Sequence, residues 1–146
     1  MLQNGDGRDG GVTAESSAVA ATLGARSDVG RVRRHNEDSF AAREDLGLWI
    51  VADGMGGAAA GEVASAIVVD VMAREVEEGA ALHEAIAVAN RSILDAAASG
   101  EGRPGMGSTV VAAQLRGSDY EIAWVGDARA YLWGDGLRRI SRDHSR

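Results

Sequence analysis

A carboxylate followed at once by glycines stands out in the first half of the chain. Asp53 ends the apolar run of residues 49–52 and precedes the glycine-rich segment 54–57. The apolar run predicts a strand, which would hold the carboxylate in place, and the glycines would let other groups approach it closely. Hard divalent cations prefer oxygen ligands, so Asp53 is a candidate metal ligand. The alternative is a glycine-rich turn in which Asp53 is only a capping residue.

A second acidic pair, Glu37 and Asp38, follows the basic run of residues 31–36. Neighbours in a strand point to opposite faces, so the two carboxylates share a site only if the chain bends or one acts through backbone or water. The alternative is a solvated acidic pair. Arg33 and Arg34 are candidate phosphate ligands, because a guanidinium presents paired donors to phosphate oxygens. Metal-binding acids beside phosphate-binding bases are typical of phosphoryl chemistry at a metal centre.

Three further polar segments border apolar runs. Asp127, within residues 126–129, is either a turn residue or a metal ligand at the same sheet edge as Asp53. The segment 105–109 is typical of a flexible loop that enters a strand. The closing segment, 142–145, contains histidine beside serine. Neighbours in sequence rarely supply the geometry of a nucleophilic triad, and the chain has no nucleophile elbow.

Composition narrows the class of protein. The chain has 146 residues, of which 45% are hydrophobic and 25% charged, which is typical of one soluble domain with a core. Its net charge of −7 disfavours nonspecific binding to nucleic acid or membranes. The absence of cysteine excludes disulfides, thiolate nucleophiles and zinc–sulfur sites. The glycines after Asp53 match neither the P-loop pattern nor the dinucleotide-binding fingerprint.

The N-terminal segment favours neither a membrane anchor nor a secreted protein. Residues 1–11 are rich in glycine and polar side chains and lack the apolar centre of a signal peptide. Elsewhere no apolar run approaches the roughly 18 residues of a membrane span. We therefore expect residues 1–20 to form a flexible tail and the chain to be cytoplasmic.

The apolar pattern predicts strands first, then two helices, then strands again. The predicted strands are 20–27, 39–43, 46–52, 108–115, 120–125, 128–133 and 137–141, and the predicted helices are 62–78 and 82–98. The segment 134–136 predicts a hairpin between the last two strands. This order favours an α+β fold with a mostly antiparallel sheet over a βαβ repeat. We expect the three tryptophans, Trp49, Trp124 and Trp133, in the core or on a sheet face.

Five segments together resemble the type 2C serine/threonine phosphatases, the metal-dependent protein phosphatase (PPM) family, in its bacterial form. They are residues 27–38, 51–65, 105–109, 125–132 and 141–145, and they occur in the family's order. The resemblance implies an α+β fold, an α-β-β-α layered sandwich in which helices flank two antiparallel sheets. Residues 21–146 would then be the N-terminal part of a PPM-type phosphatase domain.

The resemblance also implies a function, the hydrolysis of phosphoserine and phosphothreonine in proteins by a metal-activated water. The ligands of two Mn²⁺ or Mg²⁺ ions, and of a third, weaker ion, would be Glu37, Asp38, Asp53, the Gly54 carbonyl and Asp127. Arg33 would bind the substrate phosphate, and it would form the catalytic set with Asp38 and Asp53. The implied partners are a phosphorylated protein substrate and a kinase or its targets, without nucleic acid or membrane.

One departure from the family leaves an alternative open. The family has further acidic ligands in a later Asp-Gly segment and an Asp-Asn segment, and the sequence ends before either. We therefore expect a C-terminally truncated domain with too few carboxylates for a complete two-metal site. The alternatives are a catalytically incomplete binding or regulatory fragment of the same fold and a cut piece with no independent role.

Overall fold

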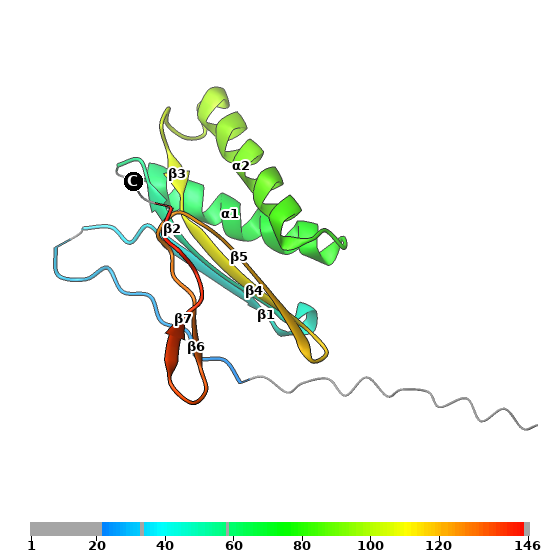
Figure 1. Cartoon of the computed structure of the whole chain (residues 1–146). Coiled ribbons are helices and arrows are strands. Elements are labelled where there is room, and N and C mark those ends of the chain that lie inside the picture. Colours follow the sequence, from blue (N-terminus) through cyan, green and yellow to red (C-terminus); the bar gives the residue numbers. More distant parts are fainter. Residues whose placement is uncertain (1–21, 33, 58, 145–146) are drawn as a thin grey trace, which may run out of the picture.

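An antiparallel sheet carries the acidic residues. A computed structural model of the chain describes residues 22–32, 34–57 and 59–144. In these ranges the strand order is β1-β2-β4-β5 (Figure 1). The strands are β1 (Asp38–Arg43), β2 (Leu48–Met55), β4 (Val110–Arg116) and β5 (Asp119–Val125). A short strand, β3 (Gly107–Ser108), pairs with the end of β2, and β6 (Tyr131–Trp133) pairs with β7 (Leu137–Arg139) in a separate hairpin.

Two helices cover one face of this sheet (Figure 1). The helix α1 (Ala60–Glu77) packs on β1 and β2, and α2 (Leu82–Ser99) packs on α1 and β5. Alternate residues of β2, Leu48, Ile50 and Ala52, are fully buried beneath the helices, because successive strand residues point to opposite faces. Burial of a Leu or Ile side chain contributes about 1.5–3 kcal/mol. Because these residues face the helices, the residues between them, as well as Asp53, must face the other side of the sheet.

The helices form where apolar residues recur every three or four positions. In α2 the buried residues are Leu82, Ala85, Ala89, Ile93 and Ala96, which lie on one face of the helix. At its start the Glu84 carboxylate accepts a hydrogen bond from the Ala81 N–H at 3.0 Å. At its end Gly100 adopts a left-handed φ of 88°. Neither described helix has the length and apolar character that crossing a membrane requires.

The sheet face away from the helices is also apolar. The strand register places on it Phe40, Ala42, Trp49, Val51, Val111, Ala113, Ile122 and Trp124. Phe40 and Val51 are 49% and 52% exposed. Trp133 lies instead on the β6–β7 hairpin and is 75% exposed. Of the two predicted positions, the core is therefore wrong for Trp133, which lies on the exposed two-stranded sheet of this hairpin.

The predicted element order is confirmed, and the α+β class with it. The predicted strand at 20–27 is wrong for its described part, because residues 23–27 border a hollow along β1 and β2 without pairing. Residues 20 and 21 lie outside the described ranges, as does the predicted tail, 1–20. The predicted strand at 46–52 begins at Leu48 because Glu44–Leu46 form a 3-10 turn, and it continues to Met55.

Three other strands are shorter than predicted: the last, predicted at 137–141, ends at Arg139, and hydrogen bonds explain the other two. The predicted strand at 108–115 is interrupted at Thr109, whose N–H donates to the Asp53 carbonyl at 2.8 Å. The predicted strand at 128–133 begins only at Tyr131. Upstream of it, the Ala130 N–H donates to the Ser141 hydroxyl at 2.9 Å, which draws this segment toward the end of the chain.

Candidate metal centre

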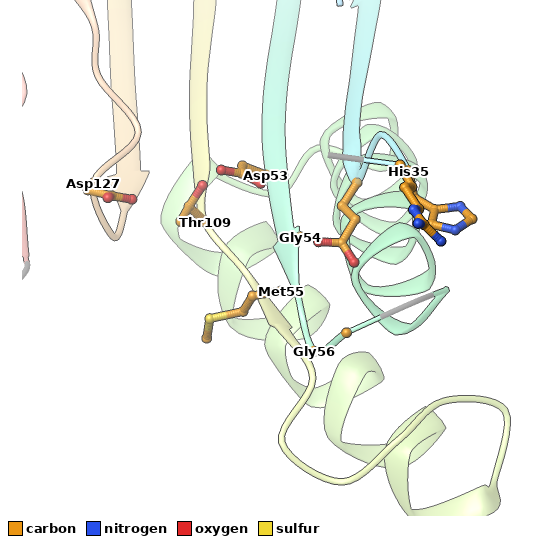
Figure 2. Close-up of a pocket in the computed structure, with 10 residues that line it drawn as sticks. His35, Asp53, Gly54, Met55, Gly56, Thr109 and Asp127 are labelled. Atoms are coloured by element: carbon orange, nitrogen blue, oxygen red, sulfur yellow. The ribbon is translucent and has the colours of Figure 1, made fainter. Parts of the chain in front are cut away.

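One cavity gathers carboxylates from three separate segments of the chain. Glu37 precedes β1, Asp53 lies in β2 and Asp127 follows β5, and all three line a cavity of about 400 Å³. Figure 2 shows the side chains of Asp53 and Asp127 on facing sides of this cavity, with Thr109 between them. Asp127 lies in a turn, and it lines the same cavity as Asp53.

Asp38 lies directly opposite Asp53 across the β1–β2 pair. Directly opposed residues share a face of the sheet, with Cβ atoms about 4.5–5.5 Å apart. Two carboxylates at such a distance repel each other, so a cation beside them is favoured. Glu37 precedes the first residue of β1, and it lines a smaller cavity together with Asp38 and Asp53. Glu37 and Asp38 therefore line one cavity although they are neighbours in the chain, which is the condition for both to serve one site.

Glycine is required where α1 begins against β2. A Cβ atom on Gly54 would lie 1.9 Å from the carbonyl oxygen of Gly61, and one on Gly61 would lie 2.6 Å from Cδ of Glu37. Real Cβ atoms essentially never come so close to another heavy atom. The Gly54 N–H also donates to the Glu37 carbonyl at 3.0 Å. These contacts hold the Glu37 carboxylate against the first turn of α1, where the helix dipole favours negative charge.

The backbone of Asp53 is held from its other side by the loop that leads into β4. The Thr109 N–H and the Ser108 hydroxyl donate to the Asp53 carbonyl, at 2.8 and 3.1 Å. Thr109 Oγ1 is buried beside the cavity, and among the described residues it has no hydrogen-bond partner. A buried hydroxyl usually has a partner, so the side chain of Thr109 is a polar group that the described contacts leave unsatisfied.

Asp127 is held by the turn that follows β5. Gly126 has a left-handed φ of 88°, and a Cβ atom there would lie 2.8 Å from Cγ2 of Thr109. The His144 N–H donates to the Gly126 carbonyl at 2.9 Å, and the Gly126 N–H donates to His144 Nδ1 at 3.4 Å. His144 therefore binds the backbone beside a cavity residue, which is a different role from that of a triad histidine. Ser145 lies outside the described residues.

An ion pair connects the same two segments. The Arg129 guanidinium donates to both carboxylate oxygens of Asp143, at 3.1 and 2.7 Å, and Arg139 approaches to 3.5 Å. The hydrogen bonds from Arg129 hold the pKa of the Asp143 carboxyl below its usual range. The closing segment is thus tied to the turn at Asp127 by backbone and side-chain contacts together.

The oxygen atoms at this cavity suit a hard divalent cation. The cavity is lined by three carboxylate side chains, by Gly54 with its backbone carbonyl, and by Thr109. Within the described ranges, however, no three acidic or histidine side chains already converge on a single point. The carboxylates line the cavity wall, and a bound ion would have to draw them inward or take further ligands.

Basic residues lie at the same cavity. Arg34 and His35 line it, and His35 Nδ1 is 3.8 Å from the Glu62 carboxylate. Arg33, the predicted phosphate ligand, lies outside the described residues. Reasoning from the sequence did not single out His35 or Thr109. Two sequence features could have indicated them: the basic run before Glu37 for His35, and the glycine-rich segment before β4 for Thr109.

Comparison with known proteins assigns the family. The model of a family described as Protein phosphatase 2C matches residues 30–146, which is most of the chain. The chain belongs to the protein phosphatase 2C family. The resemblance carried by the five sequence segments is therefore confirmed.

Relatives in the protein phosphatase 2C family include two bacterial phosphatases. The serine/threonine phosphatase stp of Listeria innocua is 40% identical over 134 residues, a match that covers 82% of this chain and 53% of the relative. The serine/threonine protein phosphatase PstP of Mycobacterium tuberculosis is 40% identical over 126 residues, which covers 82% of this chain and 24% of PstP. The chain thus spans about half the length of the Listeria relative.

Solved structures agree with the protein phosphatase 2C assignment. The catalytic domain of PstP in complex with two manganese ions aligns with a TM-score of 0.73 at 38% identity, covering 81% of this chain and 54% of that one. PppA of Pseudomonas aeruginosa aligns with a TM-score of 0.71 at 41% identity, covering 82% of this chain and 55% of PppA. The α+β arrangement of the described residues is therefore that of part of the family's fold.

Proposed function

We propose that this chain takes part in the metal-dependent hydrolysis of phosphoserine and phosphothreonine in proteins. The observation that carries the proposal is the convergence of Glu37, Asp53 and Asp127 on one cavity that Arg34 also lines. Membership of the protein phosphatase 2C family supports it, as does the two-manganese complex of the PstP catalytic domain. The proposed cofactors are two Mn²⁺ or Mg²⁺ ions, with a third, weaker position at Asp127.

The proposed ligands are Glu37, Asp38, Asp53, the Gly54 carbonyl and Asp127. Bound divalent ions would polarise the phosphoryl group and lower the pKa of water so that it attacks phosphorus. Arg33 and Arg34 would bind the phosphate oxygens, and Arg33, Asp38 and Asp53 form the proposed catalytic set. Thr109 lines the same cavity.

A second candidate function is binding or regulation without turnover. One observation favours it: no three acidic or histidine side chains of the described residues already surround one point. In this case the cavity would bind a cation or a phosphorylated segment without completing hydrolysis. The two functions differ in whether bound Mn²⁺ is accompanied by release of phosphate.

The remaining parts of the proposal concern the cellular setting. We propose a cytoplasmic signalling role opposite a protein kinase, with phosphorylated proteins as substrates and no nucleic-acid or membrane partner. Residues 21–146 would form the N-terminal part of the phosphatase domain. Cell fractionation and phosphoproteome comparison after deletion of the gene test these points.

The test measures phosphate release from a phosphothreonine peptide with Mn²⁺, in parallel with Mn²⁺ titration by calorimetry. Asp53→Asn should abolish both turnover and saturable Mn²⁺ binding. The matched control is Asp119→Asn, because Asp119 begins β5 at the opposite end of that strand from Asp127. Saturable binding without turnover would favour the regulatory function. Turnover that survives chelation or Asp53→Asn would contradict the metal mechanism.

A further inference from the structure

The segment after β5 and the closing segment of the chain are joined residue by residue. The Ile140 N–H donates to the Ala130 carbonyl at 2.9 Å, and the Ser141 hydroxyl accepts the Ala130 N–H. The Trp124 indole N–H donates to the Arg142 carbonyl at 2.8 Å. The contacts of Asp143 and His144 described above continue this series. Every residue from 140 to 144 therefore binds part of the stretch 124–130.

This series ends at the turn that carries Asp127. The paired hydrogen bonds between Gly126 and His144 are its last members. The His144 ring stacks on Trp124, with centroids 6.0 Å apart and planes inclined by 25°. Trp124 is the last residue but one of β5, so the ring is oriented by the same strand that leads into the turn. His144 is thus bound at its backbone, at Nδ1 and across its ring face.

The turn itself has little other support. Asp127 and its neighbour Gly126 lie beyond the last paired residue of β5, Val125. On the cavity side, Gly126 packs against the Thr109 methyl group. Gly126, the residue before Asp127, is therefore held by a steric contact with Thr109 on one side and by His144 on the other. A change of the His144 side chain would remove the bond at Nδ1, leave the backbone bond to the Gly126 carbonyl, and not touch the cavity wall formed by Glu37 and Asp53.

We propose that His144 is a positioning residue, which directs the Asp127 carboxylate into the cavity by holding Gly126 through Nδ1. The Arg129–Asp143 ion pair anchors the segment that carries His144, and Trp124 fixes the plane of its ring. The proposal rests on the proposed function in one respect, namely that the ligand of Asp127 is a divalent cation. His144 acts on that cation only through the position of Asp127.

Two substitutions separate positioning from packing. His144→Asn keeps an acceptor at the δ position for the Gly126 N–H, whereas His144→Phe keeps a ring to stack on Trp124 but has no acceptor. Loss of a residue that orients a metal ligand typically weakens binding 10- to 100-fold. We expect His144→Phe to weaken the weakest Mn²⁺ site about tenfold in calorimetry, and His144→Asn to change it less than about threefold. Both variants should show the urea transition of a folded protein.

A double-substitution cycle tests the route of the effect. In an Asp127→Asn background, His144→Phe should cause no further loss of Mn²⁺ affinity, because the ligand that it positions is gone. A further loss there, or wild-type affinity in His144→Phe alone, would overturn the proposal. So would equal losses in the Phe and Asn variants.

A readout without metal separates this proposal from the proposed function. In ¹H–¹⁵N spectra of the metal-free protein, His144→Phe should shift the Gly126 and Asp127 amides more than His144→Asn does. If wild-type protein binds no Mn²⁺, the proposed function fails, and these shifts still decide whether His144 positions the turn. Unchanged Gly126 and Asp127 resonances in His144→Phe would overturn the positioning role.

Discussion

The two walls of the cavity are held by different kinds of contact. On the wall of Glu37 and Asp53, the backbone of β2 meets α1 so closely that Gly54 and Gly61 leave no space for a side chain. On the wall of Asp127, backbone and side-chain groups of residues 140–144 hold a turn that lies outside the sheet. The first wall is part of the folding core, and the second is attached to it. Substitutions on the first wall should therefore cause large losses in the free energy of unfolding, and substitutions on the second wall should cause smaller ones.

The largest effect is expected for Gly54→Ala. Its Cβ atom would lie 1.9 Å from the Gly61 carbonyl oxygen, so β2 and α1 would have to separate. We expect the free energy of unfolding in urea to fall by about 3 kcal/mol or more. The control is Gly134→Ala, where a Cβ atom meets nothing within 4 Å. Similar losses for the two variants would show that the close contact of β2 and α1 does not hold this wall.

A smaller loss is expected for Gly126→Ala on the other wall. The added Cβ atom would lie 2.8 Å from Thr109 Cγ2, on a backbone with a φ of 88°. We expect a loss of about 2 kcal/mol in urea unfolding, from strain and crowding together. Thr109→Ser removes the methyl group, so adding it to Gly126→Ala should restore about 1 kcal/mol. If it restores nothing, the turn does not rest on Thr109.

The smallest effect is expected for the Arg129–Asp143 ion pair, and it depends on pH. The pKa of Asp143 is lowered in the folded protein, so the pair stabilises the fold above the unfolded pKa of about 3.9. This contribution is lost as the pH falls through the folded pKa. Asp143→Asn should therefore lower the melting temperature at pH 7, and the difference from wild type should shrink below about pH 4. Asp95→Asn, at an exposed position on α2, is the control. A difference that grows with acid would contradict this account.

The sequence predicted the parts of the fold that depend on local patterns. Apolar spacing located both helices, and the acidic and glycine motifs identified Asp53 and Asp127, which line one cavity. It did not predict the ends of strands that are set by contacts distant in sequence. Thr109 interrupts a strand because it bonds to Asp53, and residues 128–130 leave the sheet because they bond to the closing segment.

The role of His144 was hidden for the same reason. The sequence around His144 indicated either membership of the family or a nucleophilic triad of unfavourable geometry. Only the fold brings His144 beside Gly126, 18 positions earlier in the chain. Likewise, the crowding at Gly54 depends on where α1 begins, which no local pattern specifies. Sequence reasoning thus found the residues that face the cavity more readily than those that hold them there.

The central claim is that one metal-binding cavity draws its ligands from three separate segments, and paramagnetic broadening by Mn²⁺ tests it most directly. Substoichiometric Mn²⁺ is added to ¹⁵N-labelled protein, and the loss of each amide signal is followed. The account predicts that the amides of Glu37, Asp53 and Asp127 broaden together and first, while that of Asp119 persists. Broadening that begins elsewhere, or that reaches only one of the three segments, would contradict it.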